Sequence, residues 1–299
     1  MAAPRKGSLL FDEQTVRELK ALRVALRRLK KGEGFAGHRS SAGHGGRFDF
    51  SGHVPYTQGE DPRSIDWRLF ARLGDLYLKR FQSETNLNIL VVMDDSASMA
   101  SPDSSPWRAS LRIAAGVCFA YAGEGTVVTV HKTSSGCDED RRVIPCRRAD
   151  QTGSTLTNLG EWENLVGGDS EPVVHPDLIE GRPNAVLLLS DFQNEQPPET
   201  LLAACAGKGI QVSCICLMSD SLRSPRVGHQ VELRDAETDE LVNVSISNEH
   251  VERYTELFEE RQRRMEQSAR RVGAGWVELS TPDTIGRMFH RMVHSGVLP

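Results

Sequence analysis

The sequence predicts an α/β fold, a doubly wound and mainly parallel sheet with helices on both faces. Residues 88–93, 184–190 and 210–217 are nearly continuous apolar runs, which is typical of strands buried on both faces. Segments of helical character separate these runs, and strands that alternate with helices build parallel sheets. The first two runs end in the carboxylates Asp94 and Asp191, at the sheet edge where open α/β folds bind ligands.

The chain before residue 87 has a different pattern, and we expect it to form separate parts. An amphipathic basic helix is predicted over 12–31, because leucines recur among basic residues and glycines follow at 32 and 34. Residues 47–50 and 76–81 read as strands and 66–73 as a helical turn. The expected parts are therefore a basic amphipathic helix at 1–33, an appended segment at 34–86 and the α/β domain at 87–299.

Further elements of the α/β domain follow from the same periodicities. A strand at 126–131 leads to a second one around 143, and the two are expected to form a hairpin edge. A hairpin insertion is predicted near 229–247. The expected helices lie at 106–122, from 153 onward, at 197–209, 248–271 and 284–297, with a last short strand at 276–279.

Composition excludes several classes of protein. Hydrophobic content of 38% with 26% charged residues is ordinary for a globular protein, and no apolar run approaches the roughly 20 residues that span a bilayer. The N-terminal residues lack the apolar region of a secretory signal, so we expect a cytoplasmic protein. The six cysteines show no zinc-binding spacing and are expected to be reduced and buried.

Charge is distributed unevenly along the chain. The net charge is -5, but residues 1–33 hold nine Lys or Arg against four acids. The rest of the chain is therefore strongly acidic, which argues against a nucleic-acid partner. The basic helix could make peripheral membrane contact through residues 12–31, or it could dock on the domain. Its narrow apolar stripe without aromatic anchors favours docking.

A set of oxygen-bearing side chains is predicted to meet at the carboxyl edge of the sheet. Two of its loops follow the buried strands, and the third, Gly153–Thr157, opens a helix. Two carboxylates with several hydroxyls suit Mg²⁺, with Mn²⁺ or Ca²⁺ as alternatives, whereas zinc would require His or Cys. Each of these residues could instead cap a helix. The predicted ligands are Asp94, Ser96, Ser98, Thr155 and Asp191.

These residues resemble a known family. The pattern D-x-S-x-S after a hydrophobic strand, a distal Thr after Gly-Ser and an Asp closing LLLSD resemble the metal-ion-dependent adhesion site of von Willebrand factor type A domains. The stretches GHRS (37–40) and GEDPRSIDW (59–67) resemble the domain of unknown function 58 (DUF58) family. That family joins such a segment to a von Willebrand A-like domain, which is the fold that the resemblance implies.

The expected function is non-enzymatic, metal-dependent binding of a partner protein that donates an acidic side chain to the metal. The resemblance implies a MoxR-type AAA+ ATPase as partner, acting in protein assembly or maturation. The alternative is a Mg²⁺-dependent phosphoester hydrolase, although the three loops offer no His or Lys base.

Neighbouring residues receive structural interpretations. Arg63, Asp66 and Trp67 are expected to be structural, as an ion pair and a core aromatic that tie the appended segment to the sheet. His290 and His294, one helical turn apart, are expected to serve packing or surface roles. Asp95 lies outside the predicted ligand set, so we expect its loss to be tolerated better than that of Asp94.

Overall fold

The computed structural model describes most of the chain. It covers residues 9–31, 48–57, 60, 62–83, 87–100, 105–122, 126–133, 143–146, 149–165, 183–193, 199–223, 225, 227–234 and 240–298. Two compact units are present. The larger comprises Met1–Phe35 and Leu87–Pro299, so the first helix belongs with the sheet, and the smaller comprises Ala36–Asn86. Each unit is described by itself.

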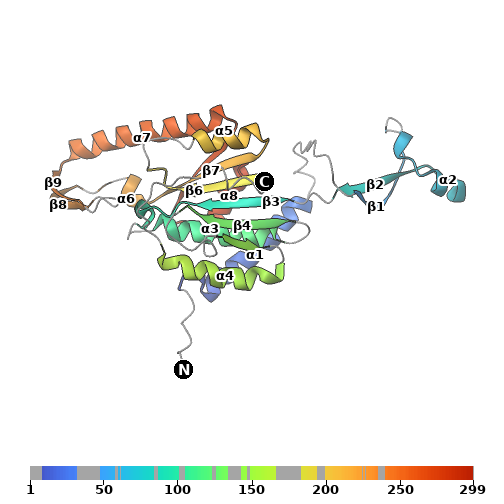
Figure 1. Ribbon diagram of the computed structural model, residues 1–299, viewed down its shortest axis with the longest axis horizontal. Helices are drawn as coiled ribbons and strands as arrows, with labels where there is room; N and C mark the ends of the chain where they lie inside the picture. Colours follow the sequence, from blue (N-terminus) through green and yellow to red (C-terminus); the bar gives the residue numbers. More distant parts are fainter. Residues whose placement is uncertain are drawn as a thin grey trace, which may run out of the picture. The chain divides into compact units, whose positions relative to one another are not determined.

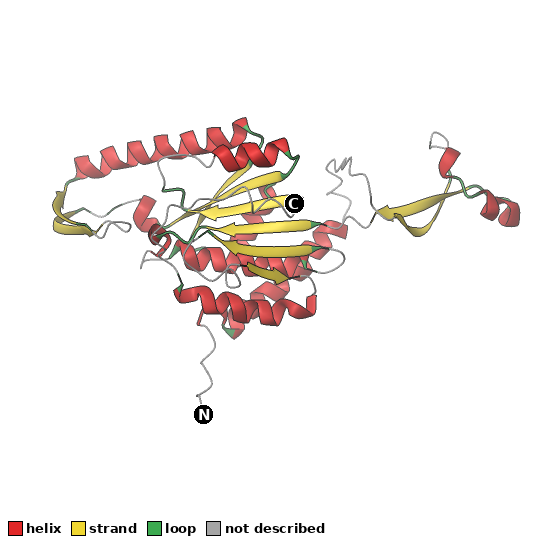
Figure 2. Cartoon of the chain, viewed as in Figure 1, coloured by secondary structure: helices red, strands yellow, loops and turns green. Residues whose placement is uncertain are grey.

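The larger unit is built on a six-stranded sheet, shown in Figures 1 and 2. The strands lie in the order β10-β7-β6-β3-β4-β5, and all neighbours pair in parallel except β5, which is antiparallel to β4. The predicted fold class is thereby confirmed. The strands are β3 (Asn88–Met93), β4 (Val127–Lys132), β5 (Val143–Cys146), β6 (Ala185–Ser190), β7 (Gln211–Met218) and β10 (Gly275–Ser280).

Helices cover both faces of this sheet (Figure 1). One layer contains α1 (Glu13–Lys31), α3 (Pro106–Tyr121), α4 (Thr152–Glu161) and α8 (Ile285–His294). The other contains α5 (Glu199–Gly207) and α7 (Asn248–Arg271), and α6 (Asp220–Arg223) follows β7. Short 3-10 turns complete the unit: η1 (Leu9–Phe11), η3 (Ala97–Ala100), η5 (Ala149–Gln151) and η6 (Trp162–Asn164).

The central strand β3 is buried on both faces, as its unbroken apolar run predicts. Ile89, Val91 and Met93 belong to the core shared with α3 and α8, whereas Leu90 and Val92 belong to the core under α5 and α7. Successive side chains of a strand point to opposite faces, so a strand between two helical layers needs an apolar residue at every position.

Helix α1 docks on the sheet unit. Leu19 and Leu26 are buried in the same core as α3 and α8. Leu22 packs against this core as a partly buried residue, so much of the described apolar stripe of the helix already contacts protein. Among the described residues, no helix combines the length and the apolar composition that crossing a membrane requires.

The smaller unit consists of β1 (Phe48–Pro55) paired antiparallel with β2 (Tyr77–Ser83), the turn η2 (Pro62–Ser64) and helix α2 (Trp67–Leu73). Asp66 caps α2 by accepting from the N–H groups of Arg68 and Leu69, and it pairs with His53 at 2.8 Å. Trp67 is 60% exposed, so its expected role as a core aromatic is wrong.

Other residues make the apolar contact of this unit. Ile65, just before the cap, forms a bridge with Leu78 of β2, and both residues are buried.

A separate two-stranded sheet lies between β7 and α7. It pairs β8 (Gly228–Arg234) with β9 (Leu241–Ile246), and the turn at 235–239 lies outside the described residues. Five of the six cysteines are described, and all five are buried with free thiols, as expected, while Cys137 is outside the described residues.

Candidate metal centre

Asp94 and Asp191 stand side by side at the carboxyl edge of the sheet. They follow the adjacent parallel strands β3 and β6, and the N–H of Asp94 donates to the carbonyl of Leu189 at 2.9 Å, which continues the strand pairing. Both carboxylates are buried, with 3% of Asp94 and 1% of Asp191 exposed. The strand register therefore brings two acidic groups to one place beneath the surface.

Hydrogen bonds fix the Asp94 carboxylate. Ser190 donates its hydroxyl hydrogen to Oδ2 at 2.6 Å, and the backbone N–H of Ser96 donates to Oδ1 at 2.9 Å. The hydroxyls of Ser96 and Ser98 lie 3.1 Å apart in the turn that follows. Asp94, Ser96 and Ser98 thus form one connected group, as the D-x-S-x-S spacing predicts.

Only one of the two carboxylate oxygens of Asp191 has a hydrogen-bond partner among the described residues. The N–H of Gln193 donates to Oδ1 at 3.1 Å, whereas Oδ2 is buried without a hydrogen-bond partner among the described residues. The hydroxyl of Ser98 faces this carboxylate and acts to lower its pKa. A buried carboxylate oxygen without a partner is costly, so this atom needs a ligand that the protein does not itself supply.

The charged form of both carboxylates is disfavoured in this place. Burial and the charge of Asp94 raise the pKa of Asp191 to about 6, and burial also raises the pKa of Asp94. A cation between them would relieve both effects. No group of three or more His, Cys, Asp or Glu that could hold a metal is found in the described part of the chain, so hydroxyls have to complete the donor set. Carboxylate and hydroxyl oxygens are the ligands that Mg²⁺ prefers, and it usually keeps several waters.

Thr155 is not brought to this cluster. Its hydroxyl donates to the carbonyl of Gln151 at 2.9 Å. Hydrogen bonds from Cys118 and Thr155 lower the pKa of the Cys146 thiol, so Thr155 lies against Cys146. Cys146 pairs with Val128, four residues before the end of β4, which corresponds to about 13 Å along the strand.

This position corrects the predicted ligand set, and the antiparallel direction of β5 explains it. That strand returns the chain to the amino edge of the sheet, so α4 begins there and ends at the carboxyl edge. Trp107 at the start of α3 donates to the carbonyl of Trp162 just beyond α4, at 2.9 Å. Residues 166–182, which follow, are outside the described residues.

Asp95 points away from Asp94, toward the end of β4. Its carboxylate accepts from the hydroxyl of Thr133 at 3.0 Å and lies 3.6 Å from the ammonium of Lys132, and both charged side chains are fully buried. The ammonium also lies 5.4 Å from the ring centroid of Trp162. The expectation that the loss of Asp95 is tolerated better than that of Asp94 concerned the ligand set alone. The buried pair gives Asp95 a role in stability, because its loss removes a carboxylate from beside a buried ammonium.

Arg261 of α7 holds the loop that carries Asp191. It donates to the carbonyl of Phe192 at 2.9 Å and to Oε1 of Gln193 at 3.3 Å. Phe192 adopts a φ of 51°, the left-handed region that non-glycine residues rarely occupy, and its ring packs on Trp276 with centroids 5.0 Å apart. Sequence reasoning missed Arg261, because it lies 70 residues from Asp191 on a helix with many arginines.

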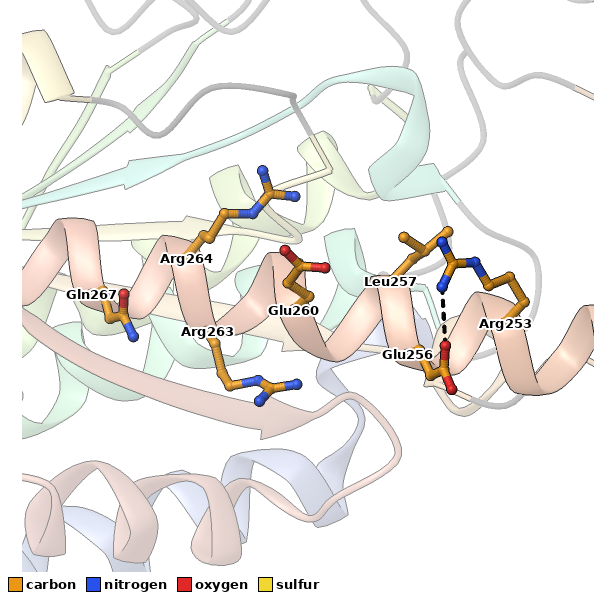
Figure 3. A pocket seen from close by; sticks show the side chains of 7 residues that line it. All are labelled: Arg253, Glu256, Leu257, Glu260, Arg263, Arg264 and Gln267. Atoms are coloured by element: carbon orange, nitrogen blue, oxygen red, sulfur yellow. Dashed lines mark hydrogen bonds and ion pairs between the residues drawn. The ribbon is translucent and has the colours of Figure 1, made fainter.

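A hollow along α7 is a weaker candidate (Figure 3). Acidic and basic side chains alternate around it, and Arg253 pairs with Glu256 at 3.1 Å on the exposed side of the helix. All of its lining residues come from one helix, and their charges largely compensate each other. The lining residues are Arg253, Glu256, Leu257, Glu260, Arg263, Arg264 and Gln267.

The fold and the site together define a class, an α/β protein with a buried acidic centre at the carboxyl edge of a mainly parallel sheet. Residues 53–266 match the family described as "Protein of unknown function DUF58". This match covers most of the chain, and the chain belongs to that family. A comparison with curated protein sequences gives no match.

Solved structures offer only distant likenesses. The conserved hypothetical protein BatB from Bacteroides thetaiotaomicron is 14% identical, with 70% of this chain and 98% of that chain covered and a TM-score of 0.40. An aerotolerance-related membrane protein from Bacteroides fragilis is 11% identical, with coverages of 71% and 100% and a TM-score of 0.36. Proximal thread matrix protein 1 from the mussel byssus, with a zinc-occupied metal-ion-dependent adhesion site, is 13% identical, with coverages of 44% and 38% and a TM-score of 0.31. At these scores none of the three carries an argument about the site.

Replacing Asp95 by Ala is expected to destabilise the protein by about 3–5 kcal/mol, because the Lys132 ammonium is left buried without its carboxylate. Urea unfolding in the presence of EDTA measures the effect. Asp94→Asn is the matched control, since it keeps the side-chain shape and removes one of two like charges, and it should cost far less. An Asp95→Ala protein as stable as the wild type would contradict the buried pair.

Replacing Arg261 by Met is expected to weaken Mn²⁺ binding by about 10-fold, as the loss of residues that orient metal ligands typically does. Isothermal titration calorimetry measures the affinity, with Arg263→Met, on the exposed side of the same helix, as control. The hydrogen bonds of Arg261 and its charge predict opposite changes in metal affinity when the residue is replaced. If its charge mattered more than its hydrogen bonds, removing a cation near Asp191 would raise the affinity.

Proposed function

We propose that this chain is a non-enzymatic adaptor that binds a partner protein through a divalent metal ion held by Asp94, Ser96, Ser98 and Asp191. The observation that carries the proposal is the pair of buried carboxylates on adjacent strands, one with an orphaned oxygen. Such a pair is unfavourable unless a cation balances it.

The donor set suits Mg²⁺, with Mn²⁺ or Ca²⁺ as alternatives, because it consists of carboxylate and hydroxyl oxygens. Two carboxylates neutralise a divalent ion without making the site negative, and Mg²⁺ rarely takes a full set of protein ligands. When bound, the ion supplies an electrophilic position that an additional carboxylate can occupy. The protein's own residues then act as a cradle, while the partner provides an Asp or Glu.

The identity of the partner rests on family resemblance. The D-x-S-x-S turn resembles the metal-ion-dependent adhesion site of von Willebrand A domains, which bind proteins. DUF58 genes commonly accompany genes for MoxR-type AAA+ ATPases. We therefore propose a MoxR-type ATPase as the partner, a role in protein assembly or maturation, and a cytoplasmic location.

A phosphoester hydrolase is the less favoured function. Ser96 and Ser98 hydrogen-bond to each other, and among the described residues no histidine contacts either hydroxyl to activate it as a nucleophile. Arg261, the basic group that holds the Asp191 loop, is a poor proton acceptor.

Calorimetric titration is expected to show binding of Mg²⁺ or Mn²⁺ to the wild type. Asp94→Ala and Asp191→Asn should each lose more affinity than the roughly 10- to 100-fold that changes outside the ligand shell cost. Thr155→Val should bind as the wild type does, because Thr155 lies near the opposite edge of the sheet. Equal binding by Asp94→Ala would rule out this site.

The same titration should depend on pH. Burial and the neighbouring Asp94 raise the pKa of Asp191 to about 6, so below that pH a proton occupies the carboxylate and competes with the metal. The affinity for the metal is therefore expected to fall as the pH is lowered from 7.5 to 5.5. Conversely, the metal-free protein should lose stability as the pH rises through about 6, because the native state binds more protons than the unfolded chain below that value.

Capture of a purified MoxR-type ATPase by the immobilised chain tests the partner. Capture is expected with Mg²⁺ and not with EDTA, and Asp191→Asn should abolish it while Thr155→Val should not. Capture that persists unchanged in EDTA would reject the metal-bridged mechanism and keep the partnership. Mg²⁺-dependent cleavage of a phosphoester that Asp94→Ala abolishes would instead establish an enzyme.

A further inference from the structure

The hairpin β8–β9 has one apolar and one polar face. In β9, Val242, Val244 and Ile246 alternate with Asn243 and Ser245. Because side chains of a strand alternate between faces, the three apolar residues share one side. In β8, Leu233 pairs directly with Val242 and joins that side. This alternation is typical of a sheet whose apolar side is covered by another layer.

In the described part of the chain this face is covered only in part. The two strands form a sheet of their own. Leu233 and Val242 are each 48% exposed, whereas Val244 and Ile246 are partly buried. A directly opposed pair of large aliphatic residues in contact with water is unfavourable by roughly 25 cal/mol per Å² of apolar surface. We define the hairpin face as Leu233, Val242, Val244 and Ile246.

The hairpin lies at the end of the unit where the carboxyl edge of the sheet carries the candidate metal centre (Figure 1). The hairpin follows α6, which begins where β7 leaves the carboxyl edge, and Tyr254 of α7 donates to the carbonyl of Leu222 in α6 at 2.8 Å (Figure 1). Arg261, which contacts the Asp191 loop, is 14 residues along α7 from the cap Ser247 at the base of the hairpin. At 1.5 Å per residue this separation is about 20 Å.

The size of the hairpin face decides which partner it suits. Two strands of six residues offer a face of about 20 by 10 Å, or roughly 200 Å². A stable interface needs roughly 800 Å² per partner, so two copies of the chain held by their hairpins alone would not form a stable dimer. A patch of 800 Å² is roughly 30 Å across, which is wide enough to include both the hairpin face and the metal centre.

We propose that the hairpin face is the second contact of the metal-bridged interface and binds an apolar segment of the partner that lies about 20 Å from its metal-binding carboxylate. The inference rests on the proposed function. The partner surface is thereby specified by its chemistry, an acidic side chain with large apolar residues about six extended residues away.

Fluorescence anisotropy with labelled synthetic peptides tests the proposal in the presence of Mn²⁺. Each 16-residue peptide carries one Asp and three leucines at alternate positions, and the spacing from the Asp to the first leucine is stepped from about four to eight residues. The wild type is compared with Val242→Ser and with Leu241→Ser. Leu241 is the matched control, because it is adjacent in sequence, 54% exposed and on the opposite face.

We expect tight binding near a spacing of six residues and a loss of about 10-fold in affinity for Val242→Ser, with less than a twofold change for Leu241→Ser. Replacing the peptide leucines by serine should remove the difference between the variants. Circular dichroism verifies that both variants are folded.

Other outcomes separate this proposal from the proposed function. Mn²⁺-dependent binding that Val242→Ser and Leu241→Ser leave equally strong would overturn the role of the hairpin and leave the metal-bridged function standing. Binding that requires Val242 but persists in EDTA would reject the metal bridge. It would thereby also reject an interface that combines the metal with the hairpin face. Failure of every peptide to bind overturns the hairpin proposal, while calorimetry judges the metal centre separately.

Discussion

Two like charges buried at one sheet edge are the constraint on which the rest of this structure depends. Asp94 and Asp191 reach their positions because β3 and β6 are adjacent parallel strands, and both strands stay adjacent because helical layers bury them on both sides. Ser190 and Arg261 then fix the carboxylates and their loop. The apolar core thus keeps the two carboxylates buried and adjacent, whereas in an unfolded chain each would be hydrated separately.

The two neighbouring aspartates, which follow the end of β3, have different partners. Asp94 turns toward β6 and joins the candidate metal centre, while Asp95 turns toward β4 and pairs with Lys132. Burial is as complete for one as for the other. What separates them is the partner, an ammonium for Asp95 and two hydrogen-bond donors, the Ser190 hydroxyl and the Ser96 N–H, for Asp94. Residue type alone would make both look like ligands.

Much of the fold could be predicted from the sequence. A continuous apolar run indicates a strand buried on both faces, and helical periodicity indicates a helix buried on one face. The cluster of Asp94, Ser96, Ser98 and Asp191 follows from strand ends alone. The resemblance to the adhesion-site motif places Thr155 at the wrong edge of the sheet. The expected hairpin edge already implies an antiparallel β5, which returns the chain to the amino edge before α4 begins. The role of Arg261 depends on a tertiary contact with the Asp191 loop, and the exposure of Trp67 depends on the absence of one. No local sequence pattern encodes either.

The strand order also governs when the centre can exist during synthesis. Ser190 lies 96 residues beyond Asp94, and pairing across such a separation forms late because loop closure must come first. On a growing chain, β3 emerges with both of its edges unpaired, and the Asp94 carboxylate remains hydrated until β6 arrives. The candidate metal centre is therefore a property of the assembled sheet, because its two carboxylates meet only after β3 and β6 have paired.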